Sequence, residues 1–193
     1  MCVAKTFIIW LLQFIFLLGL FALFLWLAIR PKHPTFTIDE FSVPNNQNSS
    51  TDADQDFTLT YTLEISNSNK DSVIYYDDIF LIFNFGQDTL KRTKIPSFKQ
   101  DKDKTRSIQV MERVDSSQKV QKTLVKEIWS GQAELKVDLS TKIRYKTWGF
   151  KSKHHGMELH ASIHIDKVGK ISGKKKKVKF SKKKMVSRAA RFH

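Results

Sequence analysis

The chain has 193 residues and a formal net charge of +14, and its single cysteine excludes an intramolecular disulfide. The charge is uneven, because residues 174–193 contain eight Lys and two Arg without any acidic residue, so that only +4 remains for the first 173 residues. The basic balance therefore describes the C-terminal segment and is no evidence for a nucleic-acid-binding fold.

Residues 7–29 form an apolar run in which Gln13 is the one polar side chain. A helix of this length reaches about 34 Å, enough to cross a hydrocarbon core about 30 Å thick. A cleaved signal peptide is the alternative, but its apolar region would be about half as long and would end in a small-x-small cleavage site. The sequence therefore predicts an uncleaved transmembrane signal-anchor helix at 7–29, preceded by a short cytosolic segment at 1–6.

The charges that flank this run do not decide its direction. Lys5 and the α-amino group precede it, and Arg30 and Lys32 follow it, which is nearly a tie under the positive-inside rule. From the residues alone, the remaining chain could lie on either side of the membrane. A sequon and the expected β-fold favour an external domain.

Cys2 lies five residues before the apolar run. A cysteine at this place is a candidate for S-acylation, and a free cytosolic thiol is the equal alternative. Position 2 is not glycine, which excludes N-myristoylation.

Alternation of apolar and polar residues predicts strands through most of residues 34–167. The segment 73–85 predicts a strand pair or one long kinked strand split at Asp77 and Asp78, and 36–43 predicts a short strand with a bulge or a register change. Residues 116–130 have apolar positions at helical spacing and predict one helix, capped by Ser116 or Ser117. The predicted strands are 36–43, 57–65, 73–85, 89–98, 105–114, 135–146 and 157–165.

Six to eight closely spaced strands without alternating helices predict an all-β fold. We expect an antiparallel β-sandwich of immunoglobulin-like or fibronectin-like topology at residues 34–167. Residues 168–193 have few apolar side chains and predict a disordered Lys/Arg-rich tail.

The tail supplies candidate binding residues for a polyanion. On the cytosolic side they would contact anionic lipid, and outside the cell they would bind an acidic polymer with strong salt dependence. The membrane helix argues against a nuclear-import or nucleic-acid patch, and a solubilising tail without a partner is a further alternative. The candidate residues are Lys174, Lys175, Lys176, Lys177, Lys179, Lys182, Lys183 and Lys184.

Asn48, followed by Ser49 and Ser50, is a candidate N-glycosylation site in the polar loop 45–56. Such tripeptides also arise by chance. A loop is the place where a glycan would fit if the domain is exported.

Two clusters suggest a metal site and are rejected on geometry. His160 and His164 are four residues apart on a predicted strand, about 13 Å, too far for one ion. Histidines 154 and 155 lie close by in sequence, and we expect all four to be solvated. Residues 52–56 match the first half of a calcium loop but lack its glycine and its final glutamate.

No nucleophile–base set, G-x-S-x-G turn or glycine-rich phosphate loop is present in the sequence. We therefore predict a protein that is not an enzyme, with no catalytic residue, no cofactor and no metal.

Several short segments, in order and with their spacing, resemble plant NDR/HIN-like (harpin-induced-like) proteins, which have a late embryogenesis abundant group 2 (LEA-2) domain. The segments are Arg30-Pro31 after the apolar run, Asn67-Ser68-Asn69-Lys70, Ile74-Tyr75-Tyr76-Asp77, Ile95-Pro96-Ser97-Phe98 with Gln100, Arg144-Tyr145-Lys146 and Lys151-Ser152-Lys153-His154.

This resemblance implies a single-pass protein of the plasma membrane or plasmodesmata whose sandwich lies outside the cytosol. It implies a role without catalysis in plant defence or stress responses, through contact between membrane and cell wall or through an unidentified protein partner. Two alternatives remain. One is a structural protein that protects membranes during dehydration, and the other is a cytosolic domain tethered to anionic lipid by the tail.

Overall fold

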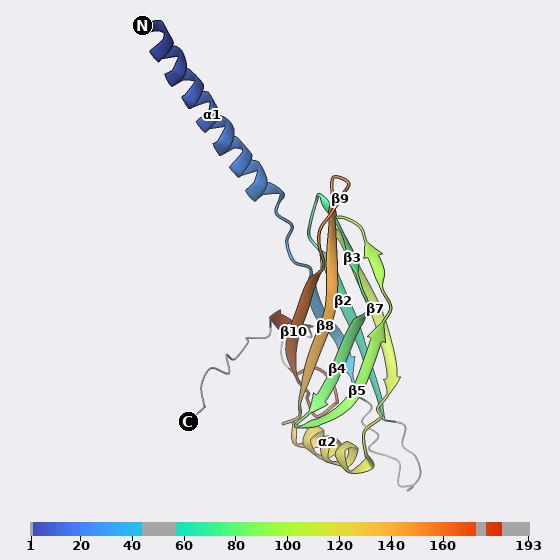
Figure 1. Ribbon diagram of the computed structural model, residues 1–193. Coiled ribbons are helices and arrows are strands. Elements are labelled where there is room, and N and C mark those ends of the chain that lie inside the picture. Colours follow the sequence, from blue (N-terminus) through green and yellow to red (C-terminus); the bar gives the residue numbers. More distant parts are fainter. Residues whose placement is uncertain (1, 44–56, 173–176, 183–193) are drawn as a thin grey trace, which may run out of the picture. The chain divides into compact units, whose positions relative to one another are not determined.

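A computed structural model describes residues 2–43, 57–172 and 177–182 (Figure 1). The chain divides into two units, residues 1–32 and residues 33–193. The first unit consists mainly of helix α1 (Cys2–Ile29), which takes in most of the predicted N-terminal segment as well as the apolar run. Within it, the 21 residues Lys5–Leu25 have a mean hydropathy of 2.7, so length and composition allow this helix to cross a membrane.

The second unit contains two antiparallel sheets, which confirms the predicted β-sandwich. The smaller sheet has the order β11 (Lys177–Lys179), β1 (Thr35–Ser42), β2 (Thr58–Asn67) and β7 (Lys104–Arg113). The larger sheet has the order β12 (Ser181–Lys182), β10 (His155–His164), β8 (Glu134–Thr147), β3 (Ser72–Tyr76) and β6 (Phe98–Gln100), with β4 (Ile79–Phe85), β5 (Asp88–Ile95) and β9 (Phe150–Lys151) beside that path. The structure has more strands than the sequence predicted because several edge strands are only two or three residues long.

Strand β8 is the central strand of the larger sheet. One edge pairs with ten residues of β10, and the other edge is shared by β3 and β4. The strand is interrupted between β3 and β4 at Asp77. The N–H of Asp77 donates to the carbonyl of Lys142, and its carbonyl accepts from the hydroxyl of Thr141. The prediction for residues 73–85 is thus confirmed: they follow a single partner strand with one kink.

The predicted bulge in β1 is also confirmed. Its register with β2 shifts between Asp39 and Ser42, and Glu40 adopts φ 50°. Just beyond the bulge, the N–H of Val43 donates to the carbonyl of Gly169 at 2.9 Å, which ties the end of β1 to the turn after β10.

The core lies between the two sheets and is rich in aromatic rings. Alternate residues of β2, from Leu59 to Ile65, are buried and face the core, while the threonines between them stay partly exposed. The ring of Phe83 from the larger sheet lies 4.8 Å from that of Tyr61 and 6.4 Å from that of Phe41, both from the smaller sheet. These contacts join the two sheets.

The predicted helix is confirmed as α2 (Gln118–Ser130), which buries Leu124 and Ile128. It ends at Gly131, whose left-handed conformation (φ 73°) lets its N–H bond to the last turn. Ser117 takes the N-cap position, but its side chain makes no capping hydrogen bond. Figure 1 places α2 at one end of the sandwich and the β8–β9 hairpin at the other.

The predicted disorder of residues 168–193 is wrong for the described residues 168–172 and 177–182. β11 pairs with β1 of the smaller sheet, and β12 pairs with β10 of the larger one. Between them, Phe180 is only 6% exposed, and its N–H donates to the carbonyl of Phe36. Open sheet edges offer backbone partners, and the buried Phe180 and the partly buried Val178 pack this segment against the core.

Gly169 has φ 83°, and a Cβ placed on it would lie 2.3 Å from the carbonyl oxygen of Val43. Gly86 has φ 59° but open space around it. Gly86→Ala should therefore cost about 1 kcal/mol from backbone strain alone, and Gly169→Ala about 1–3 kcal/mol more from steric overlap. Urea denaturation of the full chain in detergent measures both. Equal losses would contradict the close approach at Gly169.

Phe180→Ala should lower the free energy of unfolding by about 3 kcal/mol, because it empties a site between the sheet edges. Lys179→Ala is the matched control, since this neighbour is exposed on β11. Hydrogen exchange provides a second measurement: Phe180→Ala should speed exchange at the amides of 177–182, and protection equal to that of the native chain would show that Phe180 does not hold this segment.

Candidate functional site

Asn67 and Asn69, in one of the segments that carry the family resemblance, form a buried polar network. The side-chain NH₂ of Asn67 donates to the carbonyls of Ser72 and Asp101, both at 3.0 Å. Its side-chain oxygen accepts from the backbone N–H of Asn69 at 3.1 Å and from the Asn69 side chain at 2.9 Å. Asn67 therefore joins the turn before β3 to the turn after β6, at the end of the sandwich that carries β9.

Gln100, in a second such segment, completes the network. Its NH₂ group donates to the carbonyls of Ile65 and Lys104, and its oxygen accepts from the hydroxyl of Tyr76, each at 2.8 Å. Burial raises the pKa of Tyr76, so this hydroxyl stays a neutral donor. Both groups of the Gln100 carboxamide are thus engaged inside the protein, and the network has a structural role.

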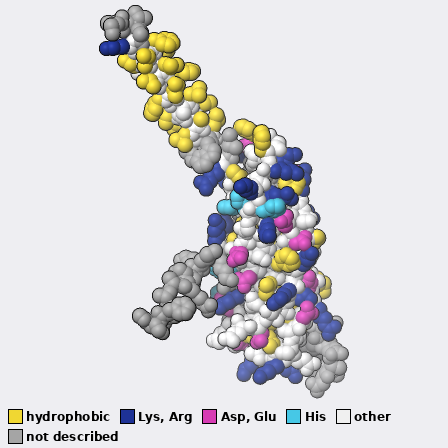
Figure 2. All heavy atoms as spheres, viewed as in Figure 1, with side chains coloured by type: hydrophobic (Ala, Val, Ile, Leu, Met, Phe, Trp, Pro, Cys, Tyr) yellow, Lys and Arg dark blue, Asp and Glu magenta, His cyan; other side chains and the backbone are white. Residues whose placement is uncertain are grey.

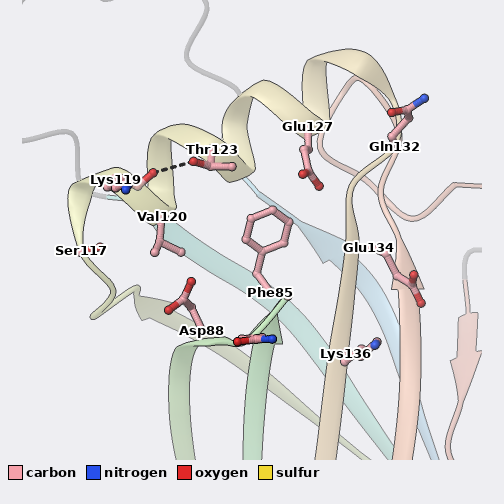
Figure 3. A pocket seen from close by; sticks show the side chains of 12 residues that line it. Phe85, Asp88, Ser117, Lys119, Val120, Thr123, Glu127, Gln132, Glu134 and Lys136 are labelled. Carbon is pink, nitrogen blue, oxygen red and sulfur yellow. Dashed lines mark hydrogen bonds between the residues drawn. The ribbon is translucent and has the colours of Figure 1, made fainter.

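A cleft of about 660 Å³ lies under α2 (Figure 3). Val120, Thr123 and Glu127 of α2 face the ring of Phe85 and the ends of β5 and β8. The remaining lining residues are Gly86, Gln87, Asp88, Ser117, Lys119, Gln132, Glu134 and Lys136. The lining mixes both signs of charge and includes no histidine or cysteine.

The histidines lie as the strand prediction requires. His160 and His164 are both on β10, and Nε2 of His160 lies 3.3 Å from the hydroxyl of Ser181. Nε2 of His154 lies 3.7 Å from a carboxylate oxygen of Asp77. Across the described ranges, no three His, Cys, Asp or Glu side chains gather in a way that could hold a metal ion.

The basic candidates divide into engaged and exposed lysines. Nζ of Lys177 lies 2.9 Å from carboxylate oxygens of both Asp39 and Glu64, and its hydrogen bonds to Glu64 and Asp39 raise the pKa of the ammonium group. Lys177 is therefore held by two carboxylates of the smaller sheet and is a weak candidate for a polyanion. Lys179 and Lys182 are exposed and lie on the two edge strands.

The other candidates lie outside what the structure describes. Lys174, Lys175, Lys176, Lys183, Lys184 and Asn48 are in segments that it leaves out, as are the acidic residues 52–56. Cys2 is in α1, but its side chain is not described. The sites at these residues remain predictions.

Sequence reasoning missed the two edge strands. A signal was present, because Val178 and Phe180 alternate with lysines and Ser181 as in a half-buried strand. The alternation is too short and too charged to stand out from the rest of the tail. The partners of Lys177 could not be found from sequence, because Asp39 and Glu64 are more than a hundred residues away.

Comparison with known proteins agrees with the resemblance. The family model for late embryogenesis abundant protein (LEA_2) matches residues 62–161, just over half of the chain. Protein NDR1 of Arabidopsis thaliana is 31% identical over 184 residues, which cover 89% of this chain and 80% of that protein. A crystal structure of a protein from Archaeoglobus fulgidus aligns with 68% of this chain and 95% of its own, at 7% identity and a TM-score of 0.31, too low to support an argument.

Gln100→Leu should lower the free energy of unfolding by about 3 kcal/mol, because it removes the hydrogen-bond partner of the Tyr76 hydroxyl and of the carbonyls of Ile65, which is buried, and Lys104, which is partly exposed. Tyr76→Phe removes one of the three hydrogen bonds and should cost about 1 kcal/mol. Chemical denaturation of the full chain in detergent measures both variants. If Gln100→Leu cost no more than Tyr76→Phe, the network would not stabilise the sandwich.

Proposed function

Because the chain belongs to the NDR/HIN-like proteins with a LEA-2 domain, we propose that it is a single-pass, non-enzymatic protein of the plasma membrane or the plasmodesmata. Its sandwich would lie outside the cytosol and act in defence or stress responses as a contact between membrane and wall, or through a protein partner. The family and the similarity to Protein NDR1 support a plant defence or stress role.

The observation that carries the membrane proposal is the surface of α1. Apart from Leu20, which is only partly exposed, its large apolar side chains from Phe7 to Leu25 are between 44% and 72% exposed. A helix that is apolar all round needs a protein core or a membrane around it. Each such side chain gains about 1.5–3 kcal/mol when it leaves water, so their sum favours retention of the helix in a bilayer.

A binding role for the sandwich is supported by what the described surface offers. It has a mixed-charge cleft and exposed lysines on edge strands, without an assembled catalytic set. We propose that the basic segment binds an acidic polymer of the wall, such as de-esterified pectin. Because Lys177 is ion-paired, the lysines before β11 and after β12 would make most of the contact.

Topology separates this proposal from its rival. In sealed microsomal vesicles, a domain outside the cytosol should survive added protease, and Asn48 should carry a glycan that an endoglycosidase removes. Asn48→Gln is the control for the glycan. Digestion of the sandwich without detergent would instead support a cytosolic domain tethered to anionic lipid by the basic segment.

The integral character of α1 has its own test. After alkaline carbonate extraction, the full-length chain should remain in the membrane pellet with its first residues still present. A shortened product in the soluble fraction would show that the apolar run is a cleaved signal peptide.

Wall binding should depend on where the lysines lie as well as on their number. The triple variant Lys174→Gln, Lys175→Gln, Lys176→Gln should leave a polygalacturonate column at lower salt than the native chain, because three charges that contact the polymer are lost. The matched control replaces Lys119, Lys122 and Lys126, which are exposed on α2. Equal shifts for both variants would mean that net charge alone causes retention, and no shift would refute wall binding.

Induction separates the defence role from membrane protection during drying. Protein amount that rises with desiccation and not with a pathogen or elicitor would favour the structural stress role.

A further inference from the structure

The hairpin between β8 and β9 presents two aromatic side chains to solvent. Trp148 is 66% exposed and Phe150 is 82% exposed. Thr147 pairs with Phe150, so the turn consists of Trp148 and Gly149 alone, with φ values of 51° and 91°. Tight hairpins of this kind normally place Asn or Gly at the first position, because a bulky residue is strained there.

Because two thirds of its surface is exposed, Trp148 brings little packing energy to the described sandwich. Strain that a fold retains is a pointer to function when the strained residue could have been an ordinary turn residue. Large aromatic side chains at a loop tip suit a surface that is apolar on one side and wet on the other, such as the interface of a bilayer.

The charges around the tip fit the same surface. Residues 144–153 include Arg144, Lys146, Lys151 and Lys153 and no acidic residue. Nζ of Lys151 lies 5.5 Å from the ring centre of Tyr75, and Asp101 in a neighbouring turn is neutralised by Lys99 at 3.0 Å. Figure 2 shows Lys and Arg side chains at the end of the sandwich that carries β9, as well as at the α2 end. Basic side chains beside aromatic ones match the phosphates of lipid headgroups.

The covalent chain limits how far this tip can lie from the end of α1. The hydroxyl of Tyr145 and Nδ1 of His33 are 3.2 Å apart, so His33 is bound at the same end of the sandwich as the hairpin. His33 is four residues after Ile29 in the sequence, a reach of at most about 14 Å. Tyr145 and Trp148 are three residues apart, about 10 Å along the hairpin. This limit does not depend on which way α1 crosses a membrane.

We propose that the β8–β9 hairpin is a second membrane contact, in which Trp148 and Phe150 enter the interface of the bilayer that α1 spans. Lys146 and Lys151 then lie against lipid phosphates. The inference rests on the membrane anchoring proposed above. Its consequence is that the hairpin end of the sandwich contacts lipid, whereas α2, at the opposite end of the sandwich, does not.

Tryptophan fluorescence in proteoliposomes tests the contact, because the sequence has only four tryptophans. A full-length variant with Trp10→Phe, Trp26→Phe and Trp129→Phe keeps Trp148 alone. In vesicles with phospholipid brominated near the headgroup end of the acyl chains, Trp148 should lose most of its emission relative to unbrominated vesicles. Adding Phe150→Ser should weaken this quenching.

Two further single-tryptophan variants separate the hairpin from the anchor. Trp129 on α2 is 51% exposed and should stay unquenched by the same lipid. Trp10 lies within α1 and should be quenched by brominated lipid if the anchor is inserted. Quenching of Trp10 without quenching of Trp148 would overturn the hairpin contact and leave the anchor intact. Absence of quenching at Trp10 would remove the anchor and, with it, the hairpin contact.

Discussion

The pairing of β8 on both edges is the constraint on which the sandwich depends. Its 14 residues make it the longest strand in the described chain, and it meets β10 on one side and β3 with β4 on the other. Without β8, no strand would join β10 to β3 and β4 in the larger sheet. The kink at Asp77 follows from this constraint: β3 and β4 must both stay on β8, yet β3 also pairs with β6 and β4 with β5. The hydroxyl of Thr141 bonds to the backbone at the break and fills a gap in the ladder.

The segments that carry the family resemblance are largely those that keep this framework in place. Their buried polar side chains hydrogen-bond to one another and to the backbone, so they explain why the chain folds as it does. These residues are Asn67, Asn69, Tyr76 and Gln100. They leave little for a ligand. A fold can host many functions, and any binding chemistry of this chain must come from side chains on its surface. The two ends of the sandwich therefore say more about function than its core does: one end has the cleft under α2, and the other has the exposed aromatic side chains of the β8–β9 hairpin.

Much of the fold could be predicted because its long strands have one wet face. Period-two alternation located β2, β8 and β10, and the paired aspartates marked the kink. The short strands β6, β11 and β12 were missed, since two or three residues carry too little pattern and their pairing depends on distant edges. The same limit applies to the sites. The lysine run was evident in the sequence, but the neutralisation of Lys177 by Asp39 and Glu64 required the fold that brings them together.

Docking of β11 and β12 changes what the basic segment can do. In a fully flexible tail the positive charges would have no fixed arrangement, so the tail would bind any polyanion with little preference for how the polymer's charges are spaced. Here Lys177, Lys179 and Lys182 are fixed on adjoining edges of the two sheets, and Phe180 secures them from within. A polymer that binds the neighbouring lysines meets a surface of defined position, so its affinity should respond to the integrity of this edge as well as to charge. Loss of Phe180 would then weaken polymer binding without removing a single positive charge, an effect that salt screening alone cannot reproduce.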